Sequence, residues 1–157
     1  MDRNTLKPIP FVEDTGASRL ALIEEFPEHL AGIMDQARRH YGGLALRLGD
    51  GLSRRWLARS RNPYRDEIAD IAGRVGRPGM VLLNLSYEWT CTSGVAGARH
   101  GDGSRLLRTL DWRLDGLGRS VVVAARQGPA GPFHDVTWPG FVGVATAMAP
   151  GRFSAAI

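Results

Sequence analysis

The hydrophobic pattern of this chain changes at Pro78-Gly79, and the change limits the folds that the chain can adopt. Before this point, apolar residues recur every three or four positions, as they do on one face of an amphipathic helix. Two such series are present: Leu30, Ile33, Met34, Ala37 and Tyr41, and then Ile68, Ile71, Ala72 and Val75. Pro27 suits the start of the first helix, and Gly42-Gly43 and Gly76 suit the two ends. The first half is therefore predicted to be mainly helical.

The segment between these two helices carries a weaker pattern. Leu44 to Leu48 is short and apolar, and Gly49-Asp50-Gly51 has the composition of a turn. Ser53 is a suitable cap for a further short helix over residues 54–60. We therefore expect a break in the middle of this segment.

After Pro78-Gly79 the runs become short, apolar and rich in β-branched residues, which favours strands. Met80 to Leu85 is interpreted as a buried strand, residues 92–98 as a second strand and the segment from Arg105 as a third. Later strands are predicted at Ser120 to Ala125, Phe133 to Trp138, Phe141 to Thr146 and Phe153 to Ile157. Helices followed by an antiparallel sheet make an α+β fold, and residues 1–157 are expected to form a single unit.

Cys91, the only cysteine, stands in the middle of this change. A hairpin centred on Gly101-Asp102 or Asp102-Gly103 would place Cys91 opposite roughly residues 112 to 114. The thiol would then be near Arg108 and Asp111. These two residues are three apart, so on a strictly alternating strand their side chains face opposite ways. A bulge or the end of the strand is therefore expected near Thr109-Leu110.

These three groups together suggest a nucleophilic thiol. A thiol attacks as thiolate, and a nearby guanidinium favours that form. A base must accept the proton. If the Thr90-Cys91 bond were cut, the α-amine of Cys91 would be such a base, because free α-amino groups titrate at about 7.7–8.0. Asp111 could then orient the amine and stabilise its protonated form.

The residues around Cys91 resemble the acid ceramidase and N-acylethanolamine acid amidase family of N-terminal-nucleophile hydrolases. The resemblance rests on three pieces in order: Asn84-Leu85-x-Tyr87-Glu88, Cys91-Thr92-Ser93-x-Val95-Ala96 and Arg108-x-Leu110-Asp111. It implies a four-layer αββα sandwich and a precursor that cuts itself between Thr90 and Cys91. Residues 1–90 would become one subunit and residues 91–157 the start of the catalytic one. Cys91 would be the nucleophile, Arg108 would support the thiolate and Asp111 would hold the new amine.

The resemblance also implies the reaction. Family members hydrolyse the amide bonds of N-acylated lipids through a thioester, without a cofactor or metal. Their later strands carry an asparagine of the oxyanion hole and a further arginine, and no residue before Ile157 can be assigned to either. We therefore expect either a fragment of a longer protein or a shortened relative. The alternative function is a catalytically silent or immature form that acts as a binding or regulatory module.

The possible supporting residues leave two interpretations open. In the family, Asn84 and Glu88 precede the cleavage point, where a structural hydrogen bond is as reasonable as a part in self-cleavage. Trp112, with Tyr87, Trp89 and Trp138, either lines an acyl-chain pocket or packs in the core. The four histidines show no metal-ligand spacing, so no metal site is expected.

Composition sets the remaining expectations. The net charge is +4, and its excess lies mostly in Arg54, Arg55, Arg59, Arg61, Arg65, Arg74 and Arg77. With Lys7 as the only lysine, this reflects an arginine bias more than a phosphate track, so nucleic acid is not expected as a partner and weak contact with a lipid surface stays open. No apolar run approaches the roughly 18 residues of a membrane span. A single cysteine and a polar N-terminus predict the cytoplasm. The oligomeric state is not predicted.

Overall fold

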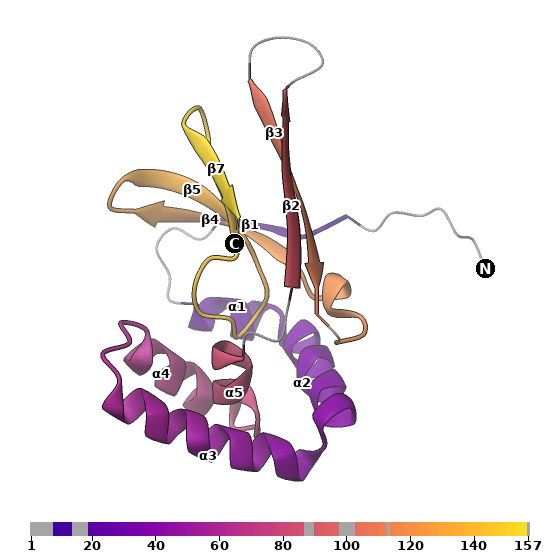
Figure 1. The fold of residues 1–157 in the computed structure, drawn as a ribbon, viewed down its shortest axis with the longest axis vertical. Coiled ribbons are helices and arrows are strands. Elements are labelled where there is room, and N and C mark those ends of the chain that lie inside the picture. Colours follow the sequence, from indigo (N-terminus) through magenta and orange to yellow (C-terminus); the bar gives the residue numbers. More distant parts are fainter. Residues whose placement is uncertain (1–7, 14–18, 87–89, 98–102, 113, 157) are drawn as a thin grey trace, which may run out of the picture.

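The computed structural model describes residues 8–13, 19–86, 90–97, 103–112 and 114–156. Helices occupy the first half of the chain and strands occupy most of the second half, so the predicted α+β class is confirmed (Figure 1). The helices lie together at one end of the molecule, and the hairpin formed by β2 (Thr90–Gly97) and β3 (Ser104–Asp111) extends away from them.

The two helices with the clearest periodicity form as predicted. The second helix, α2 (Pro27–Tyr41), buries Leu30, Ile33, Met34 and Ala37. The fourth, α4 (Arg65–Val75), buries Ile68, Ile71 and Ala72 and ends at Gly76, whose φ of 63° is left-handed. Glycine is favoured there because it has no Cβ to clash in this conformation. A short helix, α1 (Leu20–Glu25), precedes α2.

The predicted break at Gly49-Asp50-Gly51 is wrong, because residues 43–59 form one helix, α3 (Gly43–Arg59). The glycine at position 49 serves close packing instead of a turn. A Cβ built on Gly49 would be only 2.5 Å from Cδ2 of Leu82. The Gly-Asp-Gly sequence therefore lies where another helix packs against α3.

The helix that packs against α3 is α5 (Met80–Leu85), where a strand was predicted. Asp50 explains the difference. Its Oδ2 accepts a hydrogen bond from the backbone N–H of Gly79 at 2.8 Å, and its Oδ1 accepts one from Leu82 at 2.9 Å. Backbone N–H groups at the start of a helix have no partner within the helix, so this carboxylate satisfies the first turn of α5 from outside. A six-residue apolar run alone does not distinguish a strand from a buried helix.

Within the described residues, the strands form a five-stranded sheet and a separate two-stranded hairpin. The larger sheet has the order β1-β4-β5-β6-β7, and its strands are β1 (Phe11–Glu13), β4 (Val122–Gly128), β5 (Gly131–Thr137), β6 (Thr146–Ala149) and β7 (Phe153–Ala156). Its pairs are antiparallel except β1 with β4, which is parallel, so the sheet is mixed. The hairpin pairs β2 (Thr90–Gly97) with β3 (Ser104–Asp111).

The strand predicted at Phe141 to Thr146 is also wrong. Residues 138–145 form an irregular segment that is largely buried, and β6 begins only at Thr146. Trp138 and Phe141 stack in this segment with their ring centroids 4.4 Å apart. The main apolar core lies between the helices and the segments 112–117 and 138–145, so the apolar run here provides core packing.

Candidate active site

Cys91 is the second residue of β2 and is half-buried. The Nη2 of Arg108, in β3, donates a hydrogen bond to its Sγ at 3.0 Å. The structure therefore brings together the thiol and the guanidinium, two of the groups that the sequence placed near each other.

The predicted register of the hairpin is wrong, although its partner strand is correct. Cys91 lies opposite Leu110 instead of residues 112 to 114, and Ser93 lies opposite Arg108. The centre of the observed pairing thus lies earlier in the chain than the turn predicted at Gly101-Asp102-Gly103. Residues 98–102 lie outside the described part, so the turn itself is not described.

Of the two alternatives expected near Thr109-Leu110, the bulge is absent, and the strand ends at the next residue, Asp111. Each residue of β3 has its own partner in β2, from Ser104 opposite Gly97 to Asp111 opposite Thr90. Side chains therefore alternate between the two faces. Arg108 is half-buried on the face that Cys91 shares, whereas Asp111 is exposed on the other face.

Asp111 nevertheless lies close to the position that the resemblance assigns to it. It pairs with Thr90, so it lies across the ladder from the peptide bond between Thr90 and Cys91. Opposed Cα atoms in an antiparallel pair are about 4.5–5.5 Å apart. Asp111 thus occupies the ladder position next to the backbone nitrogen of Cys91, and its side chain does not share a face with the thiol.

Thr146 is a site residue that the sequence did not predict. The Nη1 of Arg108 donates a hydrogen bond to its Oγ1 at 2.7 Å. Thr146 begins β6, so this contact fixes the guanidinium between the hairpin and the larger sheet. Arg108 and Thr146 are 38 residues apart, and no local pattern in the sequence links them.

Asn84 makes three structural hydrogen bonds, and its part in self-cleavage stays a prediction. Its Nδ2 donates to the carbonyl oxygens of Met80 and Gly140, at 3.0 and 2.9 Å, and its Oδ1 accepts from the N–H of Val142 at 2.8 Å. These three bonds hold segment 138–145 against α5. Thr90 is described through its backbone only, and Glu88, Tyr87 and Trp89 lie outside the described residues.

Trp112 is part of the aromatic core. It is buried, its ring centroid is 5.9 Å from that of Trp138, and its Nε1 donates to the hydroxyl of Tyr41 at 3.4 Å. These contacts fix the end of β3 against α2. Of the two interpretations of this tryptophan, its surroundings favour core packing.

A second group of charged residues lies in the larger sheet and was not predicted. Asp135 of β5 is fully buried, and its Oδ2 accepts from Nε of Arg126 at 3.1 Å and from Nη1 of Arg19 at 3.4 Å. Arg19 also pairs with Glu67 of α4 at 3.1 Å. Burial raises the pKa of Asp135, and the two arginines oppose this effect. This network connects the helical end to the sheet.

Comparisons with known protein families and with curated proteins find no match to this chain. In the described part of the chain, no group of histidine, cysteine and acidic side chains is arranged to hold a metal ion. None of the described helices is both long and apolar enough to cross a membrane.

Proposed function

We propose that the protein is a cysteine amidohydrolase that matures by cutting itself between Thr90 and Cys91. The contact between Arg108 Nη2 and Cys91 Sγ, 3.0 Å long, carries the proposal. The position of Asp111 opposite Thr90 supports it. The residues around these three positions resemble the acid ceramidase and N-acylethanolamine acid amidase family, whose complete fold is an αββα sandwich.

The first stage is maturation. The Cys91 sulfur attacks the carbonyl carbon of Thr90, and the acyl group moves from the Cys91 nitrogen to the sulfur. Water then hydrolyses the resulting thioester. The products are a carboxylate on Thr90 and a Cys91 residue with a free thiol and a free α-amine. Residues 1–90 and 91–157 become separate chains.

The second stage is amide hydrolysis. The α-amine accepts the thiol proton, and the thiolate, held beside Arg108, attacks the substrate carbonyl carbon. The C–N bond breaks, and the amine product leaves with a proton from the ammonium group. Water then hydrolyses the acyl thioester and releases a carboxylic acid, which regenerates the thiol. Asp111 holds the ammonium form during this exchange.

The substrate class is proposed from the family resemblance, and the compartment is proposed from the chemistry of the thiol. An N-acyl amide with an aliphatic acyl group follows from the family resemblance alone. A reducing compartment such as the cytoplasm suits an enzyme whose essential thiol must stay unoxidised. No cofactor enters either stage.

The intact mass of the purified protein tests the maturation stage. Wild type is incubated from mildly acidic to neutral pH beside Cys91→Ala and the control Thr92→Ala, an exposed neighbour on the other face of β2. We expect fragments divided between Thr90 and Cys91 in wild type and in Thr92→Ala, and an uncut chain in Cys91→Ala. An uncut wild type that hydrolyses N-acyl amides would contradict the first stage, and hydrolysis by Cys91→Ala would contradict the second.

The second candidate is a binding module without catalysis. The hairpin favours it, because Val95 is 73% exposed and Leu107, on its other face, is 65% exposed. Isolated two-stranded hairpins are marginally stable in water, so a partner that packed on this hairpin would stabilise it. A thiol-reactive probe separates the two functions. An activated Cys91 reacts far faster than an ordinary thiol, whereas the Cys91 of a binding module reacts at the ordinary rate.

A further inference from the structure

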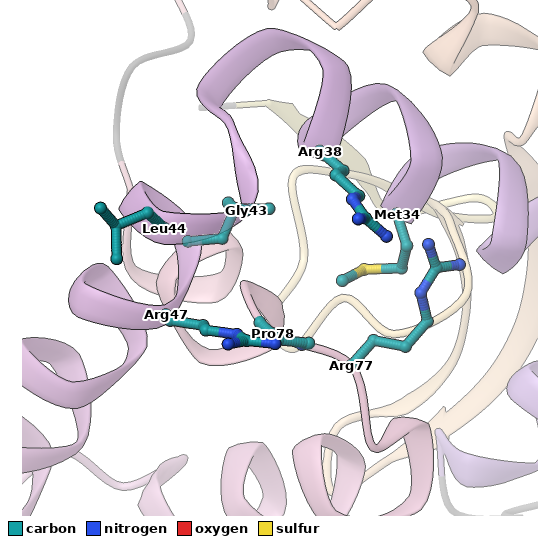
Figure 2. Close-up of a pocket in the computed structure, with 8 residues that line it drawn as sticks. Met34, Arg38, Gly43, Leu44, Arg47, Arg77 and Pro78 are labelled. Carbon is teal, nitrogen blue, oxygen red and sulfur yellow. The ribbon is translucent and has the colours of Figure 1, made fainter.

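Three arginine side chains from three different elements meet at one cavity in the helical end of the molecule. They are Arg38 of α2, Arg47 of α3 and Arg77 of the segment before α5; Figure 2 shows Arg38 and Arg47 extending toward the middle of the cavity and Arg77 extending along its side toward α2. The cavity has a volume of about 330 Å³. Cys91, Arg108 and Asp111 are not among the residues that line it, so its role is independent of the proposed active site.

The charge in this cavity is only partly compensated. Arg77 pairs with Asp35 and also donates to the carbonyl oxygen of Ala31 at 3.5 Å. Within the described residues, Arg38 and Arg47 have no ion-pair partner. Three guanidinium groups and one carboxylate leave two positive charges in excess. A bound anion would reduce the repulsion between them.

The lining of the cavity strengthens this attraction. Met34 and Leu46, which are 1% and 2% exposed, form apolar parts of its wall. Charges near such a wall are less screened than charges in open water. An adjoining cavity, which shares Arg47, Arg77 and Pro78 with the first, adds the exposed Arg54. Asp50 also lines the adjoining cavity, but its carboxylate is bonded to the N–H groups of Gly79 and Leu82.

We propose that Arg38, Arg47 and Arg77 form a binding site for a phosphate group. Guanidinium groups present paired N–H donors that match the oxygens of phosphate, and a phosphate offers enough oxygens for several such groups. A phosphate has more oxygens than a carboxylate, so it can accept from Arg38 and Arg47 and still offer an oxygen to Arg77, which also pairs with Asp35. The cavity volume of about 330 Å³ is at the lower end for small-molecule sites, roughly 300–1,000 Å³, and fits a compact phosphorylated ligand.

The phosphate can come from two sources, a free phosphorylated molecule or a lipid headgroup. Leu44 lines the cavity and is 72% exposed, so an apolar group attached to the phosphate would also find a contact. Two probes distinguish the sources. Pyrophosphate is titrated in a calorimeter, and vesicles of phosphatidylcholine with and without phosphatidic acid are sedimented with the protein, both at fixed ionic strength.

The variants are Arg38→Ala and Arg47→Ala, with Arg55→Ala as the matched control. Arg55 is an exposed arginine of α3 that does not line the cavity, so each of the three changes removes one exposed positive charge from a helix. We expect each cavity variant to weaken binding about tenfold, the size of one lost hydrogen bond to a charged group, and Arg55→Ala to leave it unchanged. Arg77→Ala also loses its contacts with Asp35 and Ala31, so its melting temperature is measured alongside.

Each outcome decides the proposal. Pyrophosphate binding that depends on Arg38 and Arg47 supports the site with a soluble ligand. Binding confined to phosphatidic acid vesicles, with the same dependence, supports it with a lipid headgroup. Failure of both probes to bind overturns the proposal. Binding that Arg55→Ala weakens as much as Arg47→Ala also overturns it, because the attraction would then belong to the basic surface as a whole.

Discussion

Arg108 lies diagonally across the β2–β3 ladder from Cys91, and its guanidinium contacts the sulfur with one nitrogen and Thr146 with the other. The two nitrogens belong to one rigid planar group, so the hydroxyl of Thr146 fixes the orientation in which the guanidinium reaches the sulfur. The larger sheet thus positions a group on the hairpin.

This geometry makes the reactivity of Cys91 depend on Arg108. In Arg108→Ala, we expect the rate of Cys91 alkylation by iodoacetamide near neutral pH to fall about tenfold or more, as expected for the loss of a hydrogen bond from a charged group. Arg108→Lys keeps the positive charge but not the paired N–H donors of the guanidinium, so its alkylation rate should lie between those of wild type and Arg108→Ala. Arg105→Ala, an exposed arginine on the same strand, is the control. Equal rates in all four proteins would mean that the contact does not activate the thiol.

Asp50 provides a test of the helical end. In Asp50→Ala, the first turn of α5 loses the acceptor for Gly79 and Leu82, and we expect the free energy of unfolding to fall by about 2–4 kcal/mol. Asp50→Asn keeps one acceptor oxygen and should lose less. Urea unfolding measures both, with the exposed Asp70→Ala of α4 as control. A loss no larger than that of Asp70→Ala would contradict the capping role.

Two glycines of α3 should respond in opposite ways to the same substitution. Gly51 has open space around it, so Gly51→Ala should stabilise the protein by about 0.5–1 kcal/mol through helix propensity. At Gly49 the new methyl group would meet Leu82, so Gly49→Ala should destabilise it by about 1–2 kcal/mol through overpacking. Thermal unfolding of the two variants checks the signs. The same sign for both would show that Leu82 moves aside easily.

Two acids should give opposite pH dependences of stability. Burial raises the pKa of Asp135 in the folded protein, so the folded state binds its proton more readily than the unfolded state. Between the unfolded pKa of about 3.9 and this raised pKa, stability is lost as pH rises. The free energy of unfolding of wild type should therefore increase, relative to that of Asp135→Asn, as pH falls through this range.

The exposed Asp35 has the opposite sign. The hydrogen bond and charge of Arg77 lower its pKa, so its contribution is present above about pH 3.9 and is lost as pH falls through the folded value. The free energy of unfolding of wild type should therefore decrease, relative to that of Asp35→Asn, as the solution becomes acid. Urea unfolding at several pH values measures both differences. Parallel trends for the two variants would contradict the assigned causes.

The elements with helical periodicity were predictable because that pattern reports the buried face directly. Residues 27–41 and 65–75 are in this class, since three or four apolar residues on one face are enough to identify each helix. Met80 to Leu85 was not predictable, because its helix depends on Asp50, which is about 30 residues earlier in the chain. Gly49-Asp50-Gly51, an expected turn, lies inside α3, where Asp50 bonds to α5 and Gly49 leaves room for Leu82.

The candidate site was also predictable only where a local sequence pattern determines the contact. The proximity of Cys91 and Arg108 followed from two strands and one hairpin, and it is confirmed. The register was not, because it depends on the turn through which the strands connect, and neither Gly101-Asp102 nor Asp102-Gly103 is the centre of the observed pairing. Thr146 was beyond sequence reasoning, since it reaches Arg108 only through the packing of two sheets.

Asp111 gives the prediction that separates catalysis from thiol activation. Its side chain is on the opposite face from the thiol, so Asp111→Asn should leave iodoacetamide labelling of the uncut protein unchanged. It should lower amide hydrolysis per cleaved molecule by about tenfold to a hundredfold, because the amine then accepts the thiol proton without a carboxylate to stabilise its charge. The cleaved fraction is quantified by intact mass, and Asp115→Asn, an exposed acid beyond the end of β3, is the control. Undiminished hydrolysis per cleaved molecule would remove Asp111 from the mechanism and leave the thiol and Arg108 as its parts.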